Sequence, residues 1–184
     1  VSVLVYWLVR ASMLGERFDI AWLPALNSGY VSLLAALVTA AAAMPVAILA
    51  VRFPGRLSSL LERTTYIGFA LPGIVIALAL VFFGANYAII FYQTLVFLVL
   101  AYMVLFLPEA VGALRSSLLQ VNPRVEEAAR TMGSTPWQTL RSITIPLMRP
   151  GILAGAALVF LTTMKELPAT LLLSPIGFKT LAMS

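Results

Sequence analysis

The chain of 184 residues is 61% hydrophobic and 10% charged, with a mean hydropathy of +1.01 and a net charge of +5. No soluble domain of this size can bury so much apolar surface, so the composition predicts a membrane protein with several spanning segments. The chain contains neither cysteine nor histidine. This excludes disulfides and thiol chemistry, and it removes the commonest zinc ligand and general base.

The first apolar run, residues 1–9, is too short to span a hydrocarbon core of about 30 Å, and we expect it to be the outer end of a truncated helix. A mixed-charge loop follows over residues 10–19. Asn27-Ser28 predicts the start of a spanning helix that continues to about Val51. Small residues recur in it every four positions and predict a face for close helix packing; they are Ala35, Thr39, Ala43 and Ala47. We expect the chain to be a fragment that lacks helices at one or both ends.

The middle of the chain alternates long apolar and polar stretches. Residues 52–63 read as a basic loop, and the uncharged residues 64–108 suit two spans with a turn near Asn86, the first span being interrupted at Leu71-Pro72-Gly73. A polar interval over residues 109–149 precedes a short apolar run, residues 150–164, in which Gly151 and Gly155 form a GxxxG packing face. Together these runs predict an all-α bundle with about five spans.

Residues 122–146 carry the signals of two short helices outside the bilayer. Asn122-Pro123 is a typical helix start, and Gly133 supplies the left-handed residue that ends a helix. Thr135 and Gln138 have the spacing of a capping box that starts a second helix, which we expect to stop before Pro146. The first of these helices has one apolar stripe at positions i, i+3, i+4 and i+7: Val125, Ala128, Ala129 and Met132.

The motif Glu127-Ala128-Ala129, then Gly133, then Ile143-Thr144-Ile145-Pro146 resembles the signature loop (the EAA motif) of the membrane subunit of bacterial ABC importers. It departs from the family pattern only at Ile145, where the family has leucine. The stretches 165–170 and 175–178 resemble the ferric-iron branch of that family. The resemblance covers the chain from about Asn27 onward.

The resemblance implies a type I ABC importer permease, with residues 1–184 as one transmembrane domain and 122–146 as a cytoplasmic coupling loop. It implies a cytoplasmic ATPase dimer that holds ATP and Mg, a periplasmic or extracellular substrate-binding protein and a second permease repeat or subunit. No cofactor, metal or nucleic acid is expected on this chain. By resemblance, Glu127 meets a basic residue of the ATPase; the other coupling residues are Val125, Ala128, Ala129, Met132, Gly133, Ile143 and Pro146. A carboxylate that merely favours a helix N-terminus is the alternative for Glu126 and Glu127.

The distribution of basic residues predicts the orientation in a bacterial cytoplasmic membrane. Placing residues 109–149 inside puts eight of the 12 Lys and Arg residues on that side and leaves four outside. This agrees with the positive-inside rule, whereas the reverse orientation violates it. We therefore expect the 109–149 loop to be cytoplasmic.

Lys165 and Glu166, followed by Pro168, form a second candidate site. The preceding apolar run is roughly 22 Å long as a helix, shorter than the hydrocarbon core, so these charges fall near membrane depth. An intramembrane charged pair is a functional hypothesis by default, and we expect these residues to line or gate a translocation path. A pair that snorkels to the interface is an equally weighted alternative.

Three other functions stay open from the sequence. A sister importer for thiamine, sulfate, polyamine or phosphonate would share the loop, and no group of residues here predicts an iron ligand set. An intramembrane enzyme would want a histidine, paired aspartates or a serine with a base, but Asp19 is the single aspartate of the chain. A passive channel would not need the motif of residues 127–133.

Overall fold

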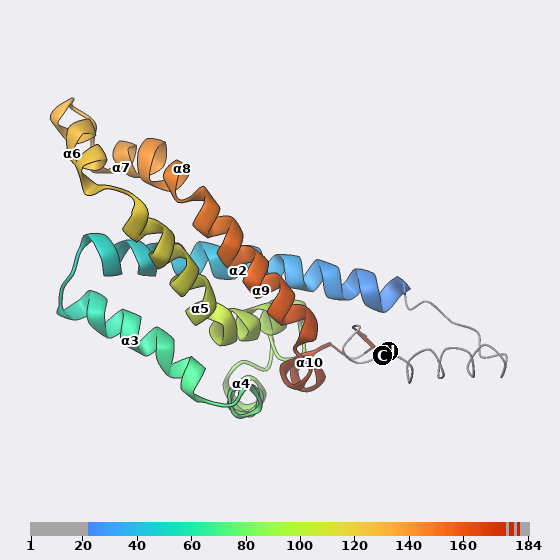
Figure 1. The fold of residues 1–184 in the computed structure, drawn as a ribbon. Helices are drawn as coiled ribbons and strands as arrows, with labels where there is room; N and C mark the ends of the chain where they lie inside the picture. The colour runs from blue at the N-terminus through green and yellow to red at the C-terminus, as the bar shows by residue number, and fades with distance from the viewer. Residues whose placement is uncertain (1–21, 176, 179, 181–184) are drawn as a thin grey trace, which may run out of the picture.

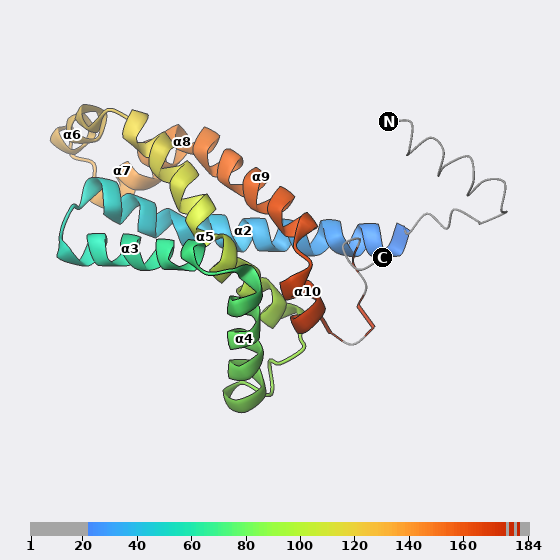
Figure 2. The same ribbon diagram turned by 60° about the horizontal axis from the view of Figure 1, so that its bottom comes forward.

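The computed structural model describes residues 22–175, 177–178 and 180, and every regular element in them is a helix (Figure 1). The predicted segments 1–9 and 10–19 lie outside the described residues. The helices, in chain order, are α2 (Trp22–Arg52), α3 (Arg56–Ala70), α4 (Gly73–Tyr87), α5 (Leu95–Gln120), α6 (Pro123–Thr131), α7 (Pro136–Thr139), the π-helix η1 (Leu140–Thr144), α8 (Ile145–Leu147), α9 (Arg149–Lys165) and α10 (Pro168–Leu173). The short helices α6 to α8 gather at one end of the bundle, here called the loop end, while α4 and α10 lie at the far end (Figures 1 and 2).

Two described helices are long and apolar enough to cross a membrane by themselves. They are α2, with 31 residues and a hydropathy of 2.4, and α5, with 26 residues and a hydropathy of 2.2. Two bent pairs pass the same test together: α3 with α4, bent by 106°, and the α7–α8 segment with α9, bent by 63°. The described residues thus hold up to four spans, which roughly fits the expected five and confirms an all-α membrane bundle.

The core lies where α2, α5 and α9 pack against one another. The predicted small-residue face of α2 is confirmed, because Ala35, Thr39, Ala43 and Ala47 are all 0% exposed. Leu98, Leu114 and Leu118 of α5 fill the space opposite, also without exposure. Small residues on one helix allow a close approach that large side chains on the next then fill.

The GxxxG face of α9 is also confirmed. A Cβ added at Gly151 would overlap the Ser117 side chain of α5 and lie 3.2 Å from the Ala113 carbonyl. At Gly155 it would lie 3.0 Å from Leu114 Cδ1. These two glycines therefore set the distance between α5 and α9.

Replacing Gly151 with leucine is expected to push α9 away from α5 and to lower the free energy of unfolding by about 1–3 kcal/mol, the usual penalty of overpacking. The matched control is Gly29→Leu on α2, where nothing lies within 4 Å of an added Cβ. Denaturant unfolding in detergent micelles measures both. Equal stability of the two variants would contradict this packing.

Three predicted boundaries were wrong because polar residues do not end these helices. The chain is already helical at Trp22, before the expected start at Asn27. The basic loop is short, since α3 begins at Arg56, where Gly55 N–H donates to Ser58 Oγ at 2.9 Å. Helix α5 continues to Gln120, so the first part of the polar interval 109–149 is the last three turns of a spanning helix rather than a loop.

The predicted interruption at Leu71-Pro72-Gly73 is confirmed and is sharper than expected. Helices α3 and α4 meet there at 106°, so they do not form one straight span. The turn expected near Asn86 is also present, since α4 ends at Tyr87 and α5 begins at Leu95. Thr94 caps α5 by accepting a hydrogen bond from Phe97 N–H at 3.3 Å.

Candidate functional site

The first short helix at the loop end, α6, begins and ends where the sequence predicts. Asn122 Oδ1 accepts a hydrogen bond from Arg124 N–H at 3.0 Å, which caps α6. The helix closes at Gly133, whose φ of +91° lies in the region that favours glycine. There Gly133 N–H bonds to the Arg130 carbonyl and Ser134 N–H to the Ala129 carbonyl, both at 3.0 Å. Gly133 thus turns the chain sharply between the two helices.

The second short helix starts as predicted but does not stop before Pro146. Thr135 N–H donates to Gln138 Oε1 at 2.9 Å and Gln138 N–H to Thr135 Oγ1 at 3.3 Å, which completes the capping box. From Leu140 the helix widens into η1, where Ile145 N–H bonds to the Leu140 carbonyl. The wider turn lets Pro146, which has no N–H, follow without ending the helix, and α8 continues to Leu147.

A buried ion pair joins this loop to the end of α2. Arg52 Nε lies 3.0 Å from Glu126 Oε1, and the two side chains are 11% and 10% exposed. Thr144 Oγ1 donates to the same carboxylate oxygen at 3.0 Å, and Arg52 Nη2 donates to the Val121 carbonyl at 2.9 Å. We call these four groups the brace.

The brace connects four parts of the chain through one ion pair. It holds the last residue of α2, the junction between α5 and α6, the first turn of α6 and the end of η1. Charged hydrogen bonds of this kind are short and strong, and breaking one partner leaves an uncompensated buried charge. The short helices are therefore fixed to the longest span of the described chain rather than hanging from it.

The two neighbouring glutamates have different surroundings. Glu126 is buried at 7% exposure, whereas Glu127 is exposed. The predicted apolar stripe divides in the same way: Ala129 is 2% exposed and faces inward, while Val125 and Met132 are 45% and 81% exposed and Ala128 is exposed too.

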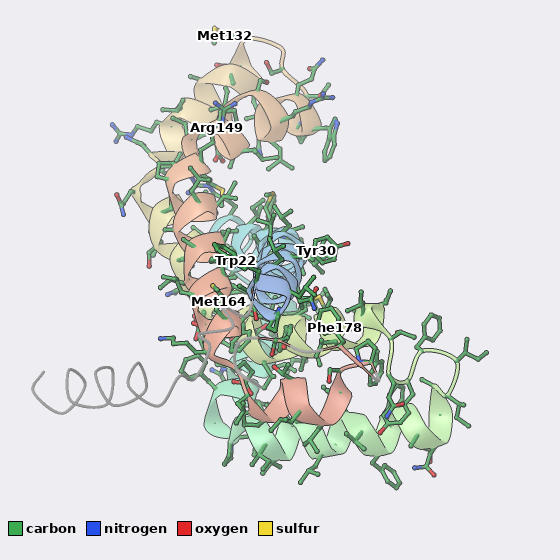
Figure 3. The ribbon with its side chains drawn as sticks, turned by 90° about the vertical axis from the view of Figure 1, so that its right-hand side faces the viewer. Trp22, Tyr30, Met132, Arg149, Met164 and Phe178 are labelled. Carbon is green, nitrogen blue, oxygen red and sulfur yellow. The ribbon has the colours of Figure 1, made fainter. Side chains whose placement is uncertain are left out.

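The outward face of α6 therefore presents Val125, Glu127, Ala128 and Met132, which we call the docking face. Figure 3 shows Met132 at the tip of the loop end, away from the bundle. Ile143 of η1 and Pro146 of α8, also predicted as coupling residues, are half-buried. The motif thus contains an exposed surface on α6 and half-buried residues on η1 and α8.

A groove of about 330 Å³ opens beside the brace, between the end of α2 and the short helices. Its walls carry both charged and apolar groups, including Phe53 and the exposed ring of Trp137. Arg52, Glu126 and Thr144 form part of its lining. The brace thus has open space on one side.

The second predicted site lies at the other end of the molecule. Lys165 is exposed at the end of α9, and Glu166 Oε1 accepts a hydrogen bond from Ala169 N–H at 3.3 Å, just inside α10, which starts at Pro168. A Cβ atom added at Gly73, the first residue of α4, would lie 3.6 Å from the same oxygen. In Figure 3, Met164 lies near this far end and Met132 at the loop end. The structure therefore does not bring the two predicted sites together.

Sequence reasoning missed Arg52 and Thr144 and considered Glu126 only for its effect on the helix dipole. Arg52 is 74 residues from Glu126 along the chain, and only the fold brings them together. The doublet Glu126-Glu127 was the one available signal, because two adjacent residues of a helix point in different directions and seldom share a role.

Sequence comparisons with known proteins identify a transport family. The model of the family described as "Binding-protein-dependent transport system inner membrane component" matches residues 41–183. The chain belongs to this family. Among its relatives in the family is the Fe(3+)-transport system permease protein FbpB 2 of Haemophilus influenzae, 41% identical over 100% of this chain and 37% of that protein. The chain therefore spans little more than a third of that relative.

Two relatives that are named for other substrates also match. The molybdenum transport system permease protein ModB of Escherichia coli is 34% identical over 83% of this chain and 72% of that protein. The sulfate transport system permease protein CysT of Escherichia coli is 32% identical over 70% of this chain and 50% of that protein. These relatives are therefore named for the transport of Fe(3+), molybdenum and sulfate.

Proposed function

We propose that this chain is the membrane-embedded part of a permease subunit in an ATP-driven importer, and that α6 docks on a partner ATPase. The observation that carries the proposal is a short helix whose exposed docking face is held rigidly by a buried brace to a spanning helix. A helix that enters a groove of a partner supplies a small apolar contact, and one charge sets its register. Val125, Ala128 and Met132 give that contact, and Glu127 gives the charge.

In this function the chain itself catalyses no bond chemistry. ATP and Mg are held by a cytoplasmic ATPase dimer, which closes on ATP and moves the docked helix. The brace passes this motion to α2, and the turn at Met148 passes it to α9. The bundle then alternates between outward and inward access, as in other two-state closures driven by a partner.

The remaining parts of the assembly follow from the same proposal. The loop end faces the cytoplasm of a bacterial inner membrane, in agreement with the positive-inside count, and lipid covers the exposed apolar faces. A periplasmic or extracellular binding protein delivers the substrate, and a second permease repeat or subunit completes the pathway. No nucleic acid takes part.

The proposed substrate is ferric iron. The support is the 41% identity to the Fe(3+) permease over the whole of this chain, against 34% and 32% over shorter parts for the molybdenum and sulfate permeases. An oxyanion is the second candidate because of these two relatives. Lys165, exposed at the far end, is a cation that would suit an oxyanion at the entrance.

The test is uptake into proteoliposomes that contain the full-length permease with the ATPase and binding protein produced with it. We expect ATP- and binding-protein-dependent accumulation of radioactive iron, without competition from molybdate or sulfate. Accumulation of an oxyanion in place of iron would overturn the substrate. Absence of any uptake dependent on the binding protein would overturn the importer function.

A further inference from the structure

Glu109 is a carboxylic acid in the middle of a spanning helix. Helix α5 is roughly 39 Å long, and Glu109 lies roughly 21 Å from its Leu95 end and 16 Å from its Gln120 end. A hydrocarbon core of about 30 Å therefore includes Glu109 wherever it falls along α5. An ionisable side chain at that depth is rare and faces protein or water, because lipid would penalise its charge.

The side chain of Glu109 faces a groove rather than the helix core. Ala110, Val111 and Leu114 form the buried side of α5, each at 0% exposure. Glu109 instead lines a groove of about 580 Å³ between α3, α5 and α9. One of its oxygens accepts a hydrogen bond from Thr162 Oγ1 of α9 at 3.1 Å, which fixes the carboxyl at the groove wall.

Other oxygen atoms lie along the same side of α5. Gly112 is one turn beyond Glu109 on α5. A Cβ atom added at Gly112 would lie 3.8 Å from the hydroxyl oxygen of Tyr66 on α3. Ser116, one further turn on, also lines the groove. Glu109, Gly112 and Ser116 share one helix face, since they are spaced by three and four residues.

Carboxylate, phenol and hydroxyl oxygens are ligands that hard cations prefer. Arg115, further along α5, pairs with Glu62 at 3.0 Å, and no basic side chain of the described residues forms an ion pair with Glu109. Among the described residues, no three acidic, histidine or cysteine side chains are grouped to hold a metal ion. A row of weak oxygen ligands without such a group suits an ion in transit, because conduction requires that binding also release the ion.

We propose that Glu109, with Tyr66 lining the same groove, is a transient binding position for a hard multivalent cation on its way through the membrane. This inference rests on the proposed import of ferric iron and gives it a place in the bundle. Glu109 supplies the negative charge, Thr162 orients it, and Gly112 leaves room for the ion and for the Tyr66 hydroxyl.

The experiment compares Glu109→Gln with wild type in the reconstituted complex of permease, ATPase and binding protein. Glutamine keeps the shape and can still accept from Thr162, but it carries no charge. We expect iron uptake to fall at least tenfold, while the ATPase stimulation caused by the iron-loaded binding protein and the unfolding midpoint stay unchanged. Glu109→Asp, which keeps the charge, should restore part of the uptake.

Equal iron uptake by Glu109→Gln and wild type would overturn the cation position and leave the importer function standing. Equal loss in Glu109→Gln of uptake, stimulation and stability would also overturn it, because it would assign Glu109 to packing. A wild-type complex that accumulates an oxyanion instead of iron would remove the cation position together with the proposed substrate. Failure of wild type to show stimulation or uptake would instead reject the proposed function itself.

Discussion

Replacing Arg52 with leucine is expected to release the loop end from α2 and to abolish ATP-driven transport. The substitution leaves Glu126 buried without a cation, and breaking a buried pair in this way costs about 3–5 kcal/mol. Since roughly 1.4 kcal/mol is a tenfold change in an equilibrium, local opening of residues 122–146 should become about 100- to 4,000-fold more frequent. Hydrogen exchange of these backbone amides measures this directly.

Two variants control for the charge alone. Arg115→Leu removes the partner of Glu62, but those side chains are 44% and 23% exposed, and an exposed pair contributes about 1 kcal/mol or less. It should change exchange in the loop little. The double variant Arg52→Leu/Glu126→Leu leaves no buried charge unpaired and should recover much of the protection. Unchanged exchange and transport in Arg52→Leu would show that the brace does not hold the loop.

Replacing Glu127 with arginine is expected to abolish binding of the ATPase while leaving the chain as stable as wild type. Glu127 is exposed on the docking face, so its removal disturbs nothing inside the subunit. Losing a close charge pair across an interface costs about 1.5 kcal/mol or more, and reversal adds repulsion. The amount of ATPase that co-purifies from solubilised membranes should fall at least tenfold.

The neighbouring residue provides a sharp contrast. Glu126→Gln should increase hydrogen exchange in the loop, because it weakens the brace, and it should affect ATPase binding less than Glu127→Arg. Arg56→Glu reverses an exposed charge at the same end of the bundle, on α3, and should leave ATPase binding close to wild type. Full co-purification of the ATPase with Glu127→Arg would remove this residue from the interface.

Local signals in the sequence were sufficient for the starts of both short helices and for the end of the first. Asn122, Gly133 and the Thr135–Gln138 pair act through hydrogen bonds or φ angles within a few residues, so their pattern predicts the geometry that the structure has. The small-residue faces of α2 and α9 were predictable for the same reason, since helical spacing alone places them on one side.

Features that depend on contacts between distant segments were not predictable in this way. Arg52 and Thr144 join Glu126 only after α2, α6 and η1 are packed together. The α5 boundary was wrong because Glu109 and Arg115 find partners on α9 and α3, which keeps a polar stretch helical inside the bundle. The widening of η1 was missed because Pro146 normally ends a helix, and a π turn removes that requirement.

The most direct test of the account is the side of the membrane on which the docking face lies. The chain contains no cysteine, so Met132→Cys, at a position 81% exposed at the tip of the loop, adds one thiol to it at the decisive place. We expect a membrane-impermeant maleimide to label that thiol in inverted vesicles stripped of the ATPase, but not in intact cells. Adding the ATPase back to the vesicles should protect the thiol from labelling. Labelling from outside intact cells, or no protection by the ATPase, would contradict the account.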